Sequence, residues 1–223
     1  MRKIVGIAIG FMLIFSSLSF AAGIEIGGVV LGGYRQGRPL VTGQDTPYSS
    51  MDDDGQLQKG VARSYTALTT GQYAGTTNIT VNAKTIAMEN QCVQDNQTGL
   101  MWMKYTPDSD IGPDTNGTLY WVDSTNHEDV FTFCDQANSE SLSGYTDWRV
   151  PNVFELFSII VEDAGIGASF IDTTYFQCVS SYYWSSTTYP DDTTRALLVR
   201  FDYGHVSYSP KATGKLFVRL VRG

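Results

Sequence analysis

Two segments of the chain carry apolar residues at the three- and four-residue spacing of one helix face. In the first segment, Thr125 and Glu128 have the spacing of a capping box, which predicts a helix that begins there. Its predicted buried face consists of Val130, Phe133, Cys134 and Ala137. In the second segment, Asn152 and Glu155 predict a similar start. Its predicted buried face consists of Val153, Leu156, Phe157 and Ile160.

After residue 178 the pattern changes to that of β-strands. Tyr203-Gly204 can turn one strand back on the next, which predicts a hairpin. The predicted strands of this part cover residues 181–187, 196–203, 205–208 and 216–221, and shorter candidates precede them at 76–81 and 100–103. Two helices followed by antiparallel strands predict an α+β domain.

The N-terminus has the pattern of a signal peptide. Arg2 and Lys3 precede an apolar run over residues 4–14, and small residues precede a predicted cut after Ala21. The run is short for a transmembrane span, although an N-terminal membrane anchor is the competing interpretation. Residues 1–21 are therefore expected to be removed on export, which leaves no later apolar stretch of membrane length.

The rest of the chain divides by composition near residue 86. Residues 22–85 are low in charge and rich in Gly, Thr and Ser, with turn signals such as Asp54-Gly55. We expect an extended N-terminal segment that is packed on the main domain or linked to it, and a flexible stalk is the alternative. Residues 86–223 hold the sharper patterns and are the predicted main domain.

Charge and composition narrow the choice of partners. The chain has 23 acidic and 15 basic residues, and Arg219 and Arg222 are too few to form a basic patch. Such a surface repels nucleic acid and anionic lipid, so neither is an expected partner. Aromatic residues make up 13% of the chain and charged residues only 17%, which is typical of a β-rich extracellular domain with many turns.

The three cysteines, Cys92, Cys134 and Cys178, allow one disulfide and one free thiol, in three possible pairings. Export would permit such a bond. A Cys134–Cys178 disulfide is favoured, because Cys134 lies on a predicted buried helix face and Cys178 precedes a predicted core strand.

Asp147-Trp148-Arg149 has the residue types of an active site, but a structural role fits them better. We expect a buried Trp148, with Arg149 in a forked ion pair or in main-chain contacts that tie a loop to a sheet. Trp102, Trp121 and Trp184 are likewise predicted to belong to the core.

The sequence offers little for catalysis or metal binding. It has two histidines, His127 and His205, and no Gly-x-Ser-x-Gly motif supports a catalytic triad. Residues 108–114 place three carboxylates in a glycine-containing loop, but calcium-loop spacing and the closing Glu are missing, so a solvated acidic loop is favoured. The predictions are no enzymatic activity, no cofactor and no metal.

The loops around the last strands are the predicted recognition surface. Flat tyrosine rings and polar groups there suit a sugar ring or a protein surface. The candidate ligand-binding residues are Tyr182, Tyr189, Asp191, Asp192, Tyr203, His205 and Tyr208. An ordinary tyrosine-rich β surface, with alternate residues buried, is the competing interpretation.

Several blocks of sequence resemble the Lcl C-terminal domain family, a widespread bacterial family long of unknown function. The blocks are residues 95–102 (DNQTGLMW), 144–152 (GYTDWRVPN), 180–187 (SSYYWSST) and 218–223 (VRLVRG), with a looser match at 54–60 (DGQLQKG). The resemblance implies a C-type-lectin-like fold and a role in binding or adhesion, although a shared fold does not fix the ligand.

These observations lead to two functional hypotheses. The first is an exported module, periplasmic or extracellular, that binds a glycan or a protein without catalysis. The second is a structural, envelope-associated protein without a small-molecule ligand.

Overall fold

The computed structural model describes residues 24–26, 29–31, 40–44, 46–48, 53–57, 60–68, 78–81, 84–87, 92–104, 117–123, 125, 129–163 and 168–223. It contains two compact units, Met1–Gly37 and Arg38–Gly223. In the first unit, β1 (Ile24–Ile26) and β2 (Val29–Leu31) form an antiparallel hairpin. The predicted signal peptide lies outside the described residues. Among the residues described, none of the helices has the length and hydropathy that crossing a membrane requires.

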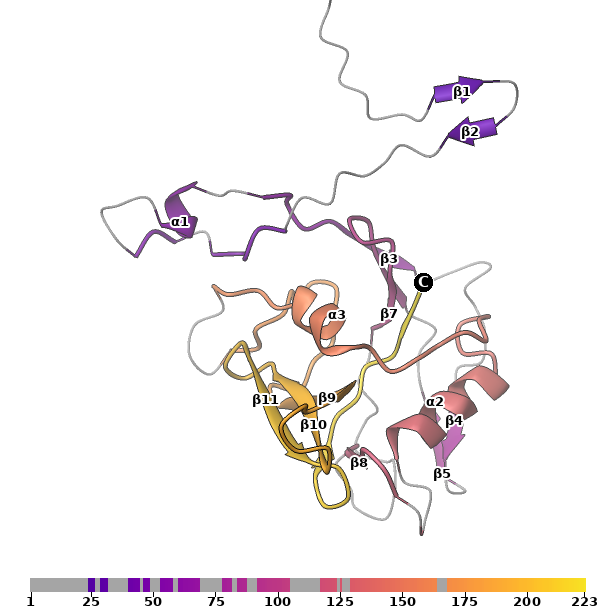
Figure 1. Ribbon diagram of the computed structural model, residues 1–223. Coiled ribbons are helices and arrows are strands. Elements are labelled where there is room, and N and C mark those ends of the chain that lie inside the picture. The colour runs from indigo at the N-terminus through magenta and orange to yellow at the C-terminus, as the bar shows by residue number, and fades with distance from the viewer. Residues whose placement is uncertain are drawn as a thin grey trace, which may run out of the picture. The chain divides into compact units, whose positions relative to one another are not determined.

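The second unit contains two main antiparallel sheets (Figure 1). The first has the strand order β13-β7-β6-β3 and consists of β3 (Tyr65–Leu68), β6 (Cys92–Asp95), β7 (Met101–Met103) and β13 (Val221–Arg222). The second has the order β11-β10-β9 and consists of β9 (Tyr182–Thr188), β10 (Arg195–Arg200) and β11 (His205–Pro210). The predicted hairpin is therefore confirmed. The predicted domain boundary at residue 86 stays a prediction, and β3, which precedes it, pairs with β6, which follows it.

Smaller elements complete this unit. Two further strand pairs join β8 (Leu119–Tyr120) to β12 (Lys215–Leu216) and β4 (Asn78–Val81) to β5 (Lys84–Ala87). The helices are α1 (Asp54–Leu57), α2 (Val130–Ser139) and α3 (Val153–Ser158). The unit is thus of mixed α+β class and mostly β, as predicted.

Helix α2 buries the face that its apolar spacing predicts. Val130, Phe133, Cys134 and Ala137 all lie in the core. The helix begins later than predicted, because the Asp129 carboxylate, and not Thr125, accepts hydrogen bonds from the first main-chain N–H groups, those of Phe131 and Thr132. A carboxylate at this position also complements the positive end of the helix dipole.

Helix α3 begins as predicted but is shorter. The Asn152 side chain accepts a hydrogen bond from the Glu155 N–H, and the Glu155 side chain accepts one from the Asn152 N–H, which is a capping box. Helix α3 packs against β9, β10 and β11 (Figure 1). The prediction for Phe157 is wrong, since its side chain lies on the flank of the helix and is 36% exposed.

The core consists of two clusters, and the β9–β10 pair contributes to both. Ala196 and Leu198 pack in the cluster that contains the α2 face, whereas Val199 packs in the cluster that contains the α3 face. Successive residues of a strand point to opposite faces of its sheet. Strand β10 is therefore buried on both faces, which explains why its centre is a continuous apolar run and does not alternate.

The predicted last strand, residues 216–221, is two separate strands in the structure. Strand β12 pairs with β8, whereas β13 pairs with β7. Between them, the Phe217 C=O accepts a hydrogen bond from the Trp184 N–H, and the Phe217 N–H donates to the Tyr182 C=O. The chain thus passes along β9 from one sheet to the other. This path also buries Arg219, a burial that no pattern in the sequence predicts.

Candidate binding site

The candidate ligand-binding residues gather at the two ends of the β10–β11 hairpin. We define the turn cluster as Tyr182, Arg200, Asp202, Tyr203 and His205. We define the loop cluster as Tyr189, Asp191, Asp192, Arg195 and Tyr208. Arg195 and Arg200 are the first and last residues of β10, which places the two clusters about 17 Å apart along the strand. Because Arg195 and Arg200 are five positions apart, an odd number, their side chains start from opposite faces of the sheet. The structure thus replaces one predicted surface by two.

Strand pairing assembles the turn cluster. Arg200 lies opposite Tyr182 on one neighbouring strand and opposite His205 on the other, so the three side chains share a face. The Arg200 guanidinium carbon lies 4.3 Å from the centre of the Tyr182 ring and 4.4 Å from that of Tyr203. The cation therefore makes cation–π contacts with two tyrosine rings.

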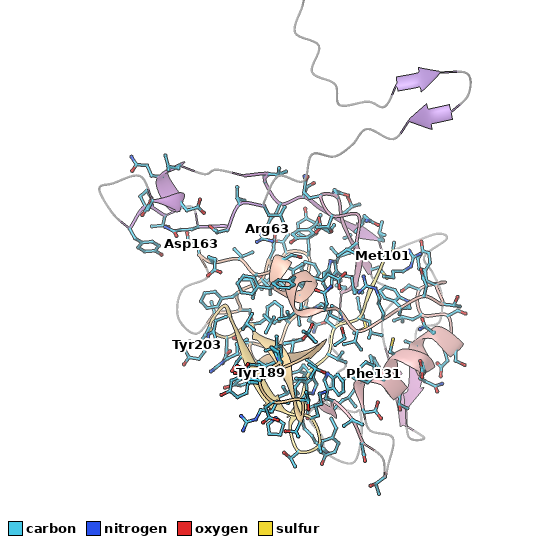
Figure 2. All side chains as sticks on the ribbon, viewed as in Figure 1. Arg63, Met101, Phe131, Asp163, Tyr189 and Tyr203 are labelled. Atoms are coloured by element: carbon cyan, nitrogen blue, oxygen red, sulfur yellow. The ribbon has the colours of Figure 1, made fainter. Side chains whose placement is uncertain are left out.

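Gly204 fixes the turn that carries Tyr203. Its φ of 68° is in the left-handed region, and a Cβ there would lie 2.6 Å from the Phe170 ring. The turn therefore needs glycine on two grounds. Tyr203 projects from this turn with 56% of its surface exposed (Figure 2).

The turn cluster neutralises its own charge. Arg200 donates two hydrogen bonds to Asp202, from Nε to Oδ1 at 3.0 Å and from Nη2 to Oδ2 at 2.7 Å. The hydrogen bond from Arg200 lowers the pKa of Asp202 below its ordinary value. Both groups are therefore ionised and paired at neutral pH, and their charges cancel within the cluster.

The loop cluster uses most of its groups internally. The Tyr189 and Tyr208 rings are stacked, with centres 4.5 Å apart and an angle of 11° between planes. The Tyr189 hydroxyl donates to Asp191 Oδ2 at 3.0 Å, and Arg195 Nε donates to Asp192 Oδ2 at 2.9 Å. Fewer ring faces and polar groups are left here for a ligand than in the turn cluster.

The sequence analysis missed Arg200, Asp202 and Arg195. Arg200 and Asp202 both flank the predicted turn, and their spacing of two residues was the available signal for an ion pair there. Periodicity could not show that the Arg200 cation contacts two rings, because one of them comes from a different strand.

Asp147-Trp148-Arg149 forms a joint between α2, α3 and β13. Trp148 is 2% exposed, and its Nε1 donates to the Leu142 C=O at 2.9 Å. Arg149 makes a forked ion pair with Glu155, with both N–O distances 2.7 Å. Asp147 accepts hydrogen bonds from Arg222 Nε at 2.6 Å and Nη2 at 3.0 Å. Trp102 and Trp184 are fully buried, and Trp121 is partly buried.

The Arg149–Glu155 ion pair should make the stability of the fold depend on pH in the acid range. Burial tends to raise the pKa of Glu155, but the Arg149 guanidinium and the Asn152 N–H outweigh it and hold the pKa below its ordinary 4.5. A lowered pKa stabilises the fold above the ordinary value, and this stabilisation is lost as the pH falls through the lowered value.

We therefore expect Glu155→Gln, which keeps the capping box, to lower the free energy of unfolding at neutral pH by about 0.5–1 kcal/mol, since Arg149 is partly exposed and solvent screens the pair. The difference from the parent should shrink as the pH falls below 4.5 through the lowered pKa of Glu155, which urea denaturation across pH can measure. A difference that stays constant with pH would contradict this account.

The cysteine prediction is wrong. The structure holds Cys92, Cys134 and Cys178 as free thiols. Cys134 donates a hydrogen bond to the Trp148 C=O in the α2 cluster, whereas Cys178 contacts the Tyr183 hydroxyl beside the α3 cluster. The two predicted partners thus lie in different parts of the core. Burial raises the pKa of Cys92 and of Cys134 to about 11.

Metal ligands are not clustered in the part of the chain that the structure describes: no three His, Cys, Asp or Glu residues there come together. The acidic loop at 108–114 and His127 lie outside the described residues.

The comparisons with known proteins agree with the sequence blocks. The family model described as Lcl C-terminal domain matches residues 91–222. The comparison with curated proteins gives no match. The match covers more than half of the chain and includes α2, α3 and the whole β9–β11 sheet. The chain belongs to the Lcl C-terminal domain family.

Proposed function

We propose that this chain is an exported, non-catalytic binding module with a C-type-lectin-like fold, and that the turn cluster binds a glycan. The observation that carries the proposal is the exposed Tyr203 ring, which Arg200 supports from behind. Export is supported by the charged start and short apolar run of residues 1–21.

The Tyr203 ring has the features of a sugar-stacking platform. A tyrosine contributes a large, flat contact area while losing little rotamer entropy. Stacking on Arg200, which is itself fixed by Asp202, limits the ring further before a ligand arrives. Such preorganisation reduces the entropy lost on binding.

The charge distribution favours a neutral ligand. The Arg200 cation is paired with Asp202, so a charged ligand would have to compete with a bidentate ion pair. His205 is exposed next to the ring, with the ring centres 6.2 Å apart, and can exchange hydrogen bonds with hydroxyl groups. An uncharged sugar uses both kinds of contact, which is why we favour a glycan over a protein ligand.

Glycan-array screening of the purified chain, followed by calorimetry on the best ligand, tests the proposal. We expect Tyr203→Ala to weaken binding at least about tenfold, as loss of a central aromatic contact does, while the melting temperature stays unchanged. Tyr203→Phe keeps the ring and should bind nearly as well as the parent.

A matched control removes an exposed tyrosine elsewhere. Tyr48 is 74% exposed and lies outside the β9–β11 sheet, so Tyr48→Ala should leave glycan affinity unchanged. Equal affinities for the parent and Tyr203→Ala would refute the assignment of the turn cluster.

A further inference from the structure

A strip of exposed apolar side chains runs along α3 and β11. It consists of Phe154, Phe157, Val206 and Tyr208, which are 83%, 36%, 42% and 45% exposed. We call these residues the apolar strip. Exposed large apolar groups that gather along one seam are typical of an interaction surface.

The geometry of α3 places its two phenylalanines on the β11 side. Phe154 and Phe157 are three residues apart and share one flank of the helix. Glu155 points the other way, to Arg149, whose main chain pairs with Val221. The Arg149 side of α3 is therefore next to the C-terminal segment that contains Phe217 and Val221. This segment lies beyond β9, because Phe217 bridges to Tyr183 of β9. The sheet order β11-β10-β9 then leaves β11 on the phenylalanine side.

Strand β11 also offers a free main-chain edge. Within the described part of the chain it pairs with β10 alone. The Lys211 N–H donates to the Thr194 C=O, so by antiparallel alternation Ser209, Ser207 and His205 direct their main-chain groups toward β10. Val206 and Tyr208 direct theirs outward. The side chains of these two residues lie opposite Val199 and Leu197, on the sheet face that α3 covers.

We propose that a second copy of this chain docks on this edge, with the two β11 strands antiparallel about a two-fold axis at Ser207. In this register Val206 of each copy lies opposite Tyr208 of the other, and these residues exchange their outward N–H and C=O hydrogen bonds. The two sheets become one, and the apolar strips meet on the face that carries α3. A two-fold interface needs one self-complementary patch, and this edge is symmetrical about Ser207.

The charges near the strip permit this occupant. The chain carries a net charge of −8, so two copies repel each other over most of their surfaces. The four side chains of the apolar strip are uncharged, Arg195, which lies over the Tyr208 ring, is paired with Asp192, and Glu155, the one acidic residue of α3, is paired with Arg149 on the opposite flank. Copies can therefore approach along this seam without bringing like charges together.

The edges also explain why pairing ends at two copies. Pro210, the next residue of β11 that would point outward, has no N–H to donate. The other edge of the sheet, at β9, is occupied by Phe217. Once two β11 strands pair, the β11 edge is no longer available to a third copy.

Sedimentation equilibrium of the purified full chain, from about 1 to about 100 µM, tests the proposal. We expect the mass of a dimer at the upper end. Phe154→Lys and Val206→Lys each put like charges into the paired strips, so each should raise the dissociation constant at least about tenfold. Both side chains are exposed, so circular dichroism should show an unchanged fold. Thr213→Lys adds the same charge on an exposed turn and should dimerise as the parent does.

Hydrogen exchange identifies the contact itself. The amides of Val206 and Tyr208 should exchange slowly in the dimer and rapidly in Val206→Lys, while the amide of Ser207 stays protected in both. A chain that remains monomeric over this range would overturn the proposal, and so would a dimer that Val206→Lys leaves intact. Tyr203 lies in the turn beyond the paired residues, so glycan binding by a monomeric variant separates this test from that of the proposed function.

Discussion

Replacing Trp148 with alanine should lower the free energy of unfolding by about 3–5 kcal/mol, as expected when a buried tryptophan is removed from a packed core. The side chain is 2% exposed and donates a hydrogen bond to Leu142. Its main chain is held from both sides, because the N–H donates to Asn138 Oδ1 at 2.7 Å and the C=O accepts from Asn138 Nδ2 at 2.8 Å. The indole therefore fills the space where the 144–152 block meets α2.

Urea denaturation measures this loss of stability, and two further variants serve as comparisons. Trp148→Phe keeps most of the volume but not the hydrogen bond, so it should cost clearly less than Trp148→Ala. Tyr203→Ala should leave stability nearly unchanged. A folded Trp148→Ala protein of normal stability that has lost glycan binding would instead place the ligand at Trp148.

Replacing Arg219 with alanine should destabilise the fold by about 3 kcal/mol or more, since each buried polar group that loses its partner costs about 1–3 kcal/mol. The Arg219 side chain is fully buried. Its Nη1 donates to the C=O groups of Met103 and Lys104, and its Nη2 donates to that of Gln177, each at 2.6 Å. One guanidinium thus joins the end of β7, the segment before β9 and the C-terminal segment.

The Arg219→Lys variant separates the effect of the charge from that of the guanidinium geometry. A single ammonium group lacks the planar fork with which Arg219 reaches three carbonyl groups, so Arg219→Lys should also be strongly destabilised although it keeps the charge. Arg222→Lys, which alters the partly exposed pair with Asp147, should cost less than about 1 kcal/mol. The Lys104 C=O also accepts from the Gln177 N–H, so a loss below about 1 kcal/mol for Arg219→Ala would show that the Met103 and Gln177 C=O groups find other partners.

Local patterns predicted the features that depend on one element. The α2 face, the α3 capping box and the β10–β11 hairpin all agree with the sequence, because each is set by side chains only a few residues apart. The sequence blocks that resemble the Lcl C-terminal domain also predicted the family correctly, because each block is a short run of neighbouring residues and the blocks occur in the expected order.

The features that sequence could not predict depend on two or more elements. Burial of β10 on both faces requires both helices, and the contacts around Arg200 require two strands, β9 and β10, and the turn that follows β10. Arg219 is an ordinary surface residue in the sequence, and its burial follows from the path of the chain between β12 and β13. The cysteine pairing failed likewise, because Cys134 and Cys178 pack in different clusters.

The separation of the seven candidate residues into two clusters has the same origin. Their closeness in sequence suggested one surface. The strand places Arg195 and Arg200 at opposite ends and on opposite faces, and so carries Tyr208 and Tyr203 apart. Of the two clusters, the turn cluster keeps an exposed ring whose supporting charge is already paired, and it is there that the proposed function can be tested.

The most direct test is an NMR titration of the isotope-labelled chain with the best oligosaccharide from the array. The account predicts that the largest shift changes fall on Tyr203, His205 and Arg200, and that Tyr203→Ala abolishes them. If no glycan binds, or if the changes fall on the loop cluster or around Trp148 while the turn cluster is unaffected, the proposed site is contradicted.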